Sequence, residues 1–147
     1  MQRLLPPVLF VLCLLGMFAL HRLLPLYQWL DWPWRALGWL PVLLGLGMVV
    51  SVAITFKRAK TNLHPFGEPD KLVTGGLFAL SRNPIYLGFA TALLGGVVLA
   101  GSLTPLLGPL VFWLVADRWY IRFEETKLLN NFAGDYQAYC RRTRRWI

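Results

Sequence analysis

Charged side chains are scarce in this chain of 147 residues, because Asp, Glu, Lys and Arg together make up only 15% of it. A soluble domain carries about 25% charged residues, so too few are present here to cover a water-facing surface. Apolar residues reach 56%, and the mean hydropathy is +0.52. The composition indicates an integral membrane protein and excludes disordered, collagen-like and disulfide-rich classes.

Cysteine and acidic residues are also few. Cys13 lies in an apolar run and Cys140 in a basic tail, and neither has a Cys or His at metal-ligand spacing, so we expect free thiols and no metal site. Seven acidic residues stand against fifteen basic ones, which gives a net charge of +8. The basic residues flank apolar segments and do not form one solvated face. This pattern favours contact with membrane lipids over nucleic-acid binding.

Four apolar segments approach the length of about 20 residues that a membrane-crossing helix requires. They cover residues 4–20, 37–56, 85–101 and 103–121. The first segment follows a basic residue, as a signal peptide does, but no small-residue cleavage site follows it, so we interpret it as a span. An aromatic-rich stretch between the first two segments suits a membrane interface.

Glycines predict where these helices pack closely. Gly45 and Gly47 offer close packing to the second segment. Only Gly101 and Ser102 separate the last two segments, which predicts a tight antiparallel hairpin. We expect the glycines of that hairpin to bring its two backbones together, namely Gly88, Gly95, Gly96, Gly101 and Gly108.

The basic residues also predict the orientation of the chain. All but two of the fifteen fall on one side of the four segments, and the exceptions are Arg22 and Arg35. The positive-inside rule then places both termini in the cytoplasm and makes this a multi-pass protein of the plasma (inner) membrane. The expected fold is all-α: one domain over residues 1–147, with four transmembrane helices, a cytoplasmic loop and an amphipathic C-terminal helix.

The junction before the third segment contains the most informative motif. Asn83 followed by Pro84 is typical of a helix start, because Asn caps free N–H groups and Pro fits the first helical position. The helix would then present its positive end, beside Arg82, to the cytoplasmic interface, where a carboxylate or phosphate binds favourably. Tyr86 lies one turn further on, so it can face the same cavity. The alternative is a capped helix with an Arg and a Tyr at the lipid interface.

An acidic pair, Glu124 and Glu125, stands near the membrane surface in the C-terminal segment. It is a candidate site for a cation such as the ammonium of an amino-acid moiety. The alternative is a set of salt bridges to Arg118 and Arg122, because these two residues share a helical stripe with Glu125. His64 is a candidate base, with an ordinary loop histidine as the alternative.

Three motifs occur in a fixed order along the chain. They are Leu72-Val73-Thr74-x-Gly76-x-Phe78, Arg82-Asn83-Pro84-x-Tyr86-x-Gly88, and Glu124-Glu125 followed by Phe132, Gly134, Tyr136 and Tyr139. This ordered set resembles the isoprenylcysteine carboxyl methyltransferase family and its phospholipid methyltransferase relatives. The resemblance covers about residues 57 to 142, and the first two apolar segments match only as hydrophobic helices.

The resemblance implies an integral membrane enzyme that uses S-adenosylmethionine without a Rossmann domain, and the sequence contains no Gly-rich βαβ fingerprint. The implied cofactor region covers residues 61–88 and 118–142. Its implied cofactor-binding residues are Lys71, Leu72, Val73, Gly76, Phe78, Asn83, Pro84, Ile85, Tyr86, Glu124 and Glu125. The candidates for catalysis are Arg82, Arg122 and His64. The family's substrate-orienting Arg falls here on Tyr120, which leaves Arg122 or Arg118 for that role.

The expected function is methyl transfer from S-adenosylmethionine to a lipophilic acceptor, either an isoprenylcysteine-type carboxylate or a related lipid. A phospholipid amine N-methyltransferase is the alternative within this class, and it needs His64 or a Glu to remove a proton. A small four-span cation transporter is the alternative without enzymatic activity. Such a protein should place an ionisable residue in mid-membrane, and the segments contain none before Asp117. The sequence gives no signal of an oligomeric state.

Overall fold

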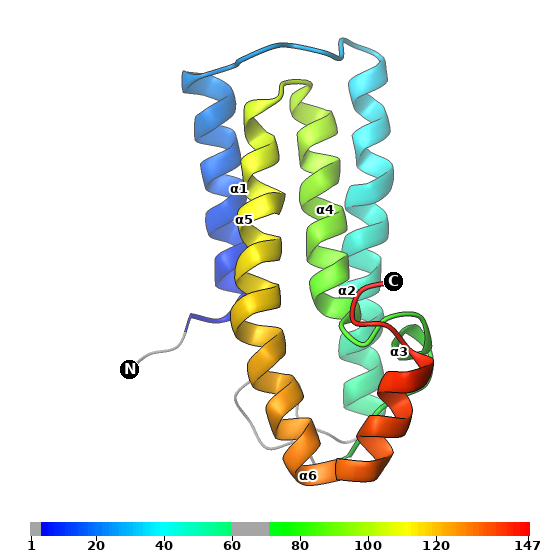
Figure 1. Ribbon diagram of the computed structural model, residues 1–147. Helices are drawn as coiled ribbons and strands as arrows, with labels where there is room; N and C mark the ends of the chain where they lie inside the picture. Colours follow the sequence, from blue (N-terminus) through cyan, green and yellow to red (C-terminus); the bar gives the residue numbers. More distant parts are fainter. Residues whose placement is uncertain (1–3, 60–70) are drawn as a thin grey trace.

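The computed structural model describes residues 4–59 and 71–147, and every regular element in these ranges is helical. The main elements are α1 (Pro6–Leu23), α2 (Trp39–Ala59), α4 (Pro84–Ala100), α5 (Leu107–Val115) and α6 (Ile121–Arg142). Helices α1, α2, α4 and α5 lie side by side in a bundle (Figure 1). Shorter elements are η1 (Trp34–Gly38), α3 (Leu77–Leu80), η2 (Thr104–Leu106) and the π-helical turn η3 (Ala116–Tyr120). The predicted all-α fold is confirmed.

The helices follow the apolar segments of the sequence. Two of them, Pro6–Leu23 and Trp34–Ala59, are long and apolar enough to cross a membrane, and Pro84–Ala100 is a shorter apolar helix. α5 taken by itself is shorter than α1, α2 and α4. The chain continues from it without a break into η3, which contains the charged residue Asp117. Large apolar side chains on α1 and α2 remain exposed, as expected where a surface faces hydrocarbon.

Glycines join α2 to α4, which is the most extensive helix contact in the bundle. A methyl group added at Gly88 would lie 2.7 Å from the Gly45 carbonyl oxygen, and one added at Gly95 would lie 2.6 Å from the Gly38 carbonyl oxygen. Two turns separate the glycines on each side, so they share one face. The two backbones therefore meet with no side chain between them.

The expectation that glycines bring α4 close to α5 is wrong. Gly88 and Gly95 face α2, whereas Gly96 and Gly108 face Met17 of α1. Gly47, also expected in close packing, has no neighbour within 4 Å of an added methyl group. The spacing of small residues marks a face of a helix, but the arrangement of the whole bundle decides which neighbour that face meets.

The predicted tight turn at Gly101 and Ser102 is confirmed. Gly101 has a φ of +65°, a left-handed conformation that ends α4 and that glycine adopts without strain. The buried Ser102 hydroxyl lies 2.8 Å from Nδ1 of His21, and the Trp29 N–H donates to the Gly101 carbonyl oxygen over 3.0 Å. These bonds tie the α1–η1 connection to the turn at the end of the bundle opposite α6 (Figure 1).

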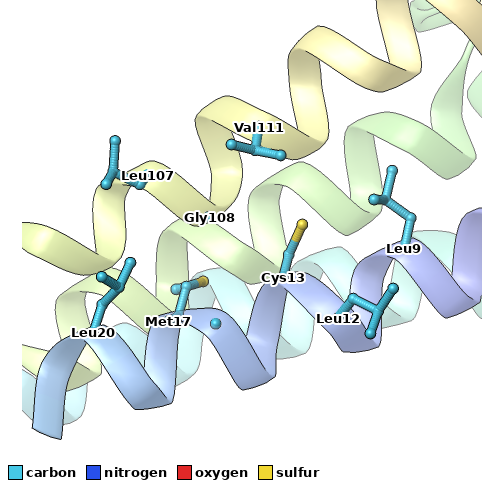
Figure 2. Close-up of a pocket in the computed structure, with 9 residues that line it drawn as sticks. Leu9, Leu12, Cys13, Met17, Leu20, Leu107, Gly108 and Val111 are labelled. Atoms are coloured by element: carbon cyan, nitrogen blue, oxygen red, sulfur yellow. The ribbon is translucent and has the colours of Figure 1, made fainter. Parts of the chain in front are cut away.

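An apolar groove of about 250 Å³ lies between α1 and α5 (Figure 2). Its lining residues are Leu9, Leu12, Cys13, Gly16, Met17, Leu20, Leu107, Gly108 and Val111. The Cys13 thiol points toward α5, and both cysteines of the chain are free. Since this lining offers water almost no polar partner, the groove suits hydrocarbon.

The C-terminal part of the chain covers one end of the bundle. α6 extends beyond the bundle, bends at Ala133, where the backbone is not helical, and returns toward α3 (Figure 1). Tyr136 and Tyr139 of this helix are buried, as expected for its apolar face, whereas Leu129 of the same predicted face is exposed. Residues 143–147, which we name the C-terminal strap, then run back to the start of α4.

Candidate functional site

Polar side chains gather where α4 begins, α6 passes and the C-terminal strap returns. The bundle next to them is an apolar core that includes Leu93, Phe112 and Ala116. The site therefore lies at one end of the bundle, next to its apolar core. The following contacts define it.

Tyr86 of α4 and Glu124 of α6 form a hydrogen-bonded pair in the site. The Tyr86 hydroxyl donates to Oε1 of Glu124 over 2.6 Å. Its ring is 4% exposed and stacks on Tyr120, with 5.9 Å between ring centroids. The Tyr120 hydroxyl in turn donates to the Leu4 carbonyl oxygen over 2.7 Å. Tyr86 is thus fixed from two sides and holds the carboxyl of Glu124 in place.

The carboxyl of Glu124 is set to titrate near neutral pH. The residue as a whole keeps some exposed surface, but protein surrounds its carboxyl group. This burial, with the charge of neighbouring Glu125, raises the pKa of Glu124 to about 7, although the hydrogen bond from Tyr86 favours the carboxylate. Such a group can be neutral or charged under physiological conditions.

Glu125 has a different environment, because two arginines neutralise it. Its Oε1 lies 3.3 Å from Nη2 of Arg82, and it accepts hydrogen bonds from Nε and Nη2 of Arg145 over 3.1 and 2.5 Å. The Arg145 contact is bidentate, the strongest arrangement for this pair of groups. Arg145 also reaches Asp117, with 3.3 Å between Nη1 and Oδ1. Two guanidinium groups from different parts of the chain therefore surround the Glu125 carboxylate.

The motif at the start of α4 binds the C-terminal strap. The Asn83 side chain donates through Nδ2 to the Arg145 carbonyl oxygen over 2.9 Å, and its N–H donates to the Ser81 hydroxyl over 3.1 Å. The Arg82 N–H donates to the Arg144 carbonyl oxygen over 3.0 Å. α4 begins after Asn83, as predicted, but the expectation that the Asn83 side chain caps the helix is wrong, since it makes no capping bond.

One donor of Arg82 is unpaired within the described residues. Its Nη1 contacts the Cys140 thiol and its Nη2 faces Glu125, while its Nε is buried and has no hydrogen-bond partner in residues 4–59 and 71–147. A buried N–H without a partner costs free energy, so an acceptor supplied by a ligand would be bound favourably there.

The segment before α4 contributes fewer contacts to this cluster. Lys71 and Gly76 are exposed, and Leu72 and Val73 are half-buried. Gly76 has a φ of +63° where α3 begins. Phe78 connects three elements, because its ring lies 5.5 Å from that of Phe56 and its carbonyl oxygen accepts a 2.6 Å hydrogen bond from Tyr139. Pro84 is fully buried and Ile85 half-buried at the start of α4.

The structure brings together Arg82, Asn83, Tyr86, Glu124 and Glu125, as the motifs predict. It does not bring Arg122 to them. The Arg122 side chain is exposed, and no hydrogen bond or ion pair joins it to this cluster in the described part of the chain. His64 lies outside the described residues.

The alternative in which Arg118 and Arg122 pair with Glu125 is wrong for residues 4–59 and 71–147. Arg118 is 68% exposed and lies 3.9 Å from Asp117, whereas Glu125 pairs with Arg82 and Arg145. Exposed pairs along a helix contribute little, and a mostly buried carboxylate is better matched by guanidinium groups from elements packed over it.

Sequence reasoning gave Arg145, Ser81 and Tyr120 no role in the site. Arg145 counted only toward the orientation of the chain, and its one signal was its place in the basic C-terminal run. Tyr120 stands where the family resemblance puts a substrate-orienting Arg, and the structure shows it stacked on Tyr86. Ser81 precedes the recognised motif and is fully buried.

Comparison with known proteins gives a clear family assignment. Residues 34–135 match the family model described as phospholipid methyltransferase. A Haemophilus influenzae protein described as "Uncharacterized protein" is 33% identical over 63 residues, which is 43% of this chain and 100% of that protein. No solved structure shows a significant match. The matched range contains α2, α4 and the Glu124–Glu125 pair. The chain belongs to the phospholipid methyltransferase family.

Proposed function

We propose that the protein is an integral membrane methyltransferase that uses S-adenosylmethionine and acts on a lipophilic acceptor. The observation that carries the proposal is the cluster of Arg82, Tyr86, Glu124 and Glu125, which places groups of both charge signs within the family-matched range at one end of an apolar bundle. The family supports a membrane methyltransferase that acts on lipid, and it does not support a transporter.

The residues of the cluster fit this cofactor. S-Adenosylmethionine carries a carboxylate and an ammonium group, and when bound it supplies a methyl group on a sulfonium. The buried Nε of Arg82 would receive the carboxylate, and Glu124, whose hydrogen-bond partner is a tyrosine, would receive the ammonium. Lys71, Leu72, Val73, Gly76 and Phe78 are the further proposed contacts, together with the α4 residues Pro84, Ile85 and Tyr86.

The protein's contribution to methyl transfer is positioning and the exclusion of water. Tyr86 is fixed by Tyr120 on one side and Glu124 on the other, so these side chains can hold donor and acceptor in a single arrangement. Alignment of two reactants supplies several kcal/mol of the barrier reduction. The adjoining apolar core keeps water from the reacting groups.

We place four helices across the membrane, with the fourth made of α5 and η3. Both termini and the site would then face the cytoplasm at the plasma membrane, because the basic residues gather at that end. The exposed apolar side chains of α1 and α2 support this arrangement. A lipophilic acceptor would reach the site from the bilayer, and the cofactor would reach it from the cytoplasm.

The acceptor is an isoprenylcysteine-type carboxylate or the amine of a phospholipid. A carboxylate needs no base, whereas an ammonium group must lose a proton before it attacks the methyl group. The pKa of about 7 at Glu124 gives the site a group that can take that proton. For this reason a phospholipid amine is the second candidate acceptor. In that reaction Glu124 would act as the base, with His64 as the alternative base.

Binding and turnover of the purified protein test the proposal. Calorimetry in detergent should show binding of S-adenosylhomocysteine, and Glu124→Ala should weaken it at least about tenfold, because an unpaired buried charge costs roughly 2–5 kcal/mol. Arg122→Ala is the matched control on the exposed face of α6. No detectable heat at millimolar ligand would contradict the proposal.

Methyl-labelled S-adenosylmethionine, incubated with lipid extracts, identifies the acceptor. Mass spectrometry would show a labelled ester for a carboxylate acceptor and a labelled N-methyl headgroup for an amine. Absence of any labelled lipid, with cofactor binding intact, would contradict a lipid acceptor.

A further inference from the structure

The C-terminal strap is bound at the site through both its backbone and its side chains. Its Arg144 and Arg145 carbonyl oxygens accept hydrogen bonds from the Arg82 N–H and from Asn83 Nδ2. The Trp146 Nε1–H donates to Oδ1 of Asp117 over 3.0 Å, and its ring lies 6.4 Å from that of Trp113. The strap is therefore held along its length and is not a loose tail.

Arg145 divides the acidic residues of the site into two kinds. It makes a bidentate contact with Glu125 and an ion pair with Asp117, so the strap compensates the charge of these two carboxylates. Glu124 receives the Tyr86 hydroxyl. Two adjacent carboxylates repel each other unless a cation compensates one of them, and Arg145 supplies that cation together with Arg82.

We propose that Arg145 is a positioning residue that neutralises Glu125 and Asp117 and thereby assigns the binding of the cofactor's ammonium group to Glu124. This inference rests on the proposed function, since it concerns how the same site recognises S-adenosylmethionine. The strap is then part of the binding site, and Asn83 acts by holding the strap in place.

The proposal has an electrostatic consequence that a purely structural role would not have. Among the described residues, Tyr86 from α4 and Glu125 from its own helix act directly on Glu124, and the guanidinium groups of Arg82 and Arg145 act through Glu125. Tyr120 from η3 stacks on Tyr86. Without Arg145, the charge of Glu125 acts more strongly on Glu124, which then stays protonated to a higher pH. A protonated carboxyl binds an ammonium group poorly, so the loss should be recovered as the pH rises.

Calorimetry of the full-length chain in detergent with S-adenosylhomocysteine, from pH 6 to pH 8.5, tests the proposal. The variants are Arg145→Gln and Arg144→Gln, which lose the same charge at neighbouring positions. Arg144 is exposed, and within residues 4–59 and 71–147 its carbonyl oxygen is the part of it that contacts the site. We expect binding to the parent to strengthen as the pH rises through about 7.

Arg145→Gln should weaken binding about fivefold at pH 7 and move the midpoint of the pH profile upward by about one unit, while Arg144→Gln keeps the parent profile. Equal profiles for the two variants, or equal weakening by Arg145→Gln at every pH, would overturn the proposal. If Arg145→Gln does not fold, Arg145→Lys takes its place in the test, because lysine retains the positive charge. A pH midpoint of ligand binding equal to that of the parent supports the proposal, and a displaced pH midpoint overturns it. A parent that binds no ligand would instead refute the proposed function.

Discussion

Glu124→Gln should make the protein more stable above neutral pH while impairing the site. The substitution keeps the shape of the side chain and an oxygen that can accept the Tyr86 hydrogen bond, but it removes a carboxyl that is costly to ionise where it lies. Groups that serve a ligand often carry such a cost in the free protein.

The magnitude follows from the pKa of Glu124, which rises from an ordinary value of 4.5 to about 7 in the folded protein. One pKa unit corresponds to about 1.4 kcal/mol, so ionising this carboxyl lowers the free energy of unfolding by at most about 3 kcal/mol. Below pH 4.5 the group is neutral in both the folded and the unfolded chain, and no loss occurs. The loss grows between pH 4.5 and 7 and is complete above pH 7.

Thermal unfolding in detergent micelles from pH 4.5 to pH 8.5 measures this effect. Glu124→Gln should unfold at the same temperature as the parent at pH 4.5 and at a higher temperature at pH 8, by roughly 2–4 °C per kcal/mol. Glu125→Gln is the matched control with the opposite expected sign, because it leaves Arg82 and Arg145 without their shared carboxylate. A difference between Glu124→Gln and the parent that does not change with pH would refute the reasoning.

Three further predictions use four substitutions. Tyr86→Phe removes the hydrogen-bond donor that favours the charged form of Glu124, so the pH midpoint of S-adenosylhomocysteine binding should rise. An unchanged midpoint in calorimetry would contradict the contact between Tyr86 and Glu124. Gly88→Ala should lower the free energy of unfolding by about 1–3 kcal/mol, because its added methyl group would meet the α2 backbone. Gly47→Ala, where an added methyl group meets open space, should stay within about 0.5 kcal/mol of the parent. Equal unfolding temperatures for these two variants would disprove the α2–α4 contact. Arg122→Ala should leave calorimetric binding of S-adenosylhomocysteine within about twofold of the parent, since its side chain is exposed; a tenfold loss would place it in the site.

The sequence alone determined the helices, the start of α4 and the turn at Gly101. These features depend on local physics: the length of an apolar run, the fixed backbone of Pro84 after Asn83, and the left-handed conformation that Gly101 adopts. The ordered motifs also predicted the family, which the match over residues 34–135 confirms. The four-span arrangement and the roles of the site residues remain predictions.

Only the tertiary structure decided which partners these residues have. Helical spacing of three and four residues suggested Arg118 and Arg122 as the salt-bridge partners of Glu125. In the structure, packing places Arg82 and Arg145 beside Glu125 instead. Contacts between residues far apart in the sequence depend on how the helices and the strap pack, which local spacing does not specify.

The acidic pair shows the same limit most clearly. Glu124 and Glu125 are adjacent in the sequence and equal in chemistry, yet a helix turns by about 100° between them. One carboxyl therefore points to Tyr86 and titrates near neutral pH, while the other points to two guanidinium groups. The helix separates the two side chains, and the elements packed around each of them determine its charge and its role.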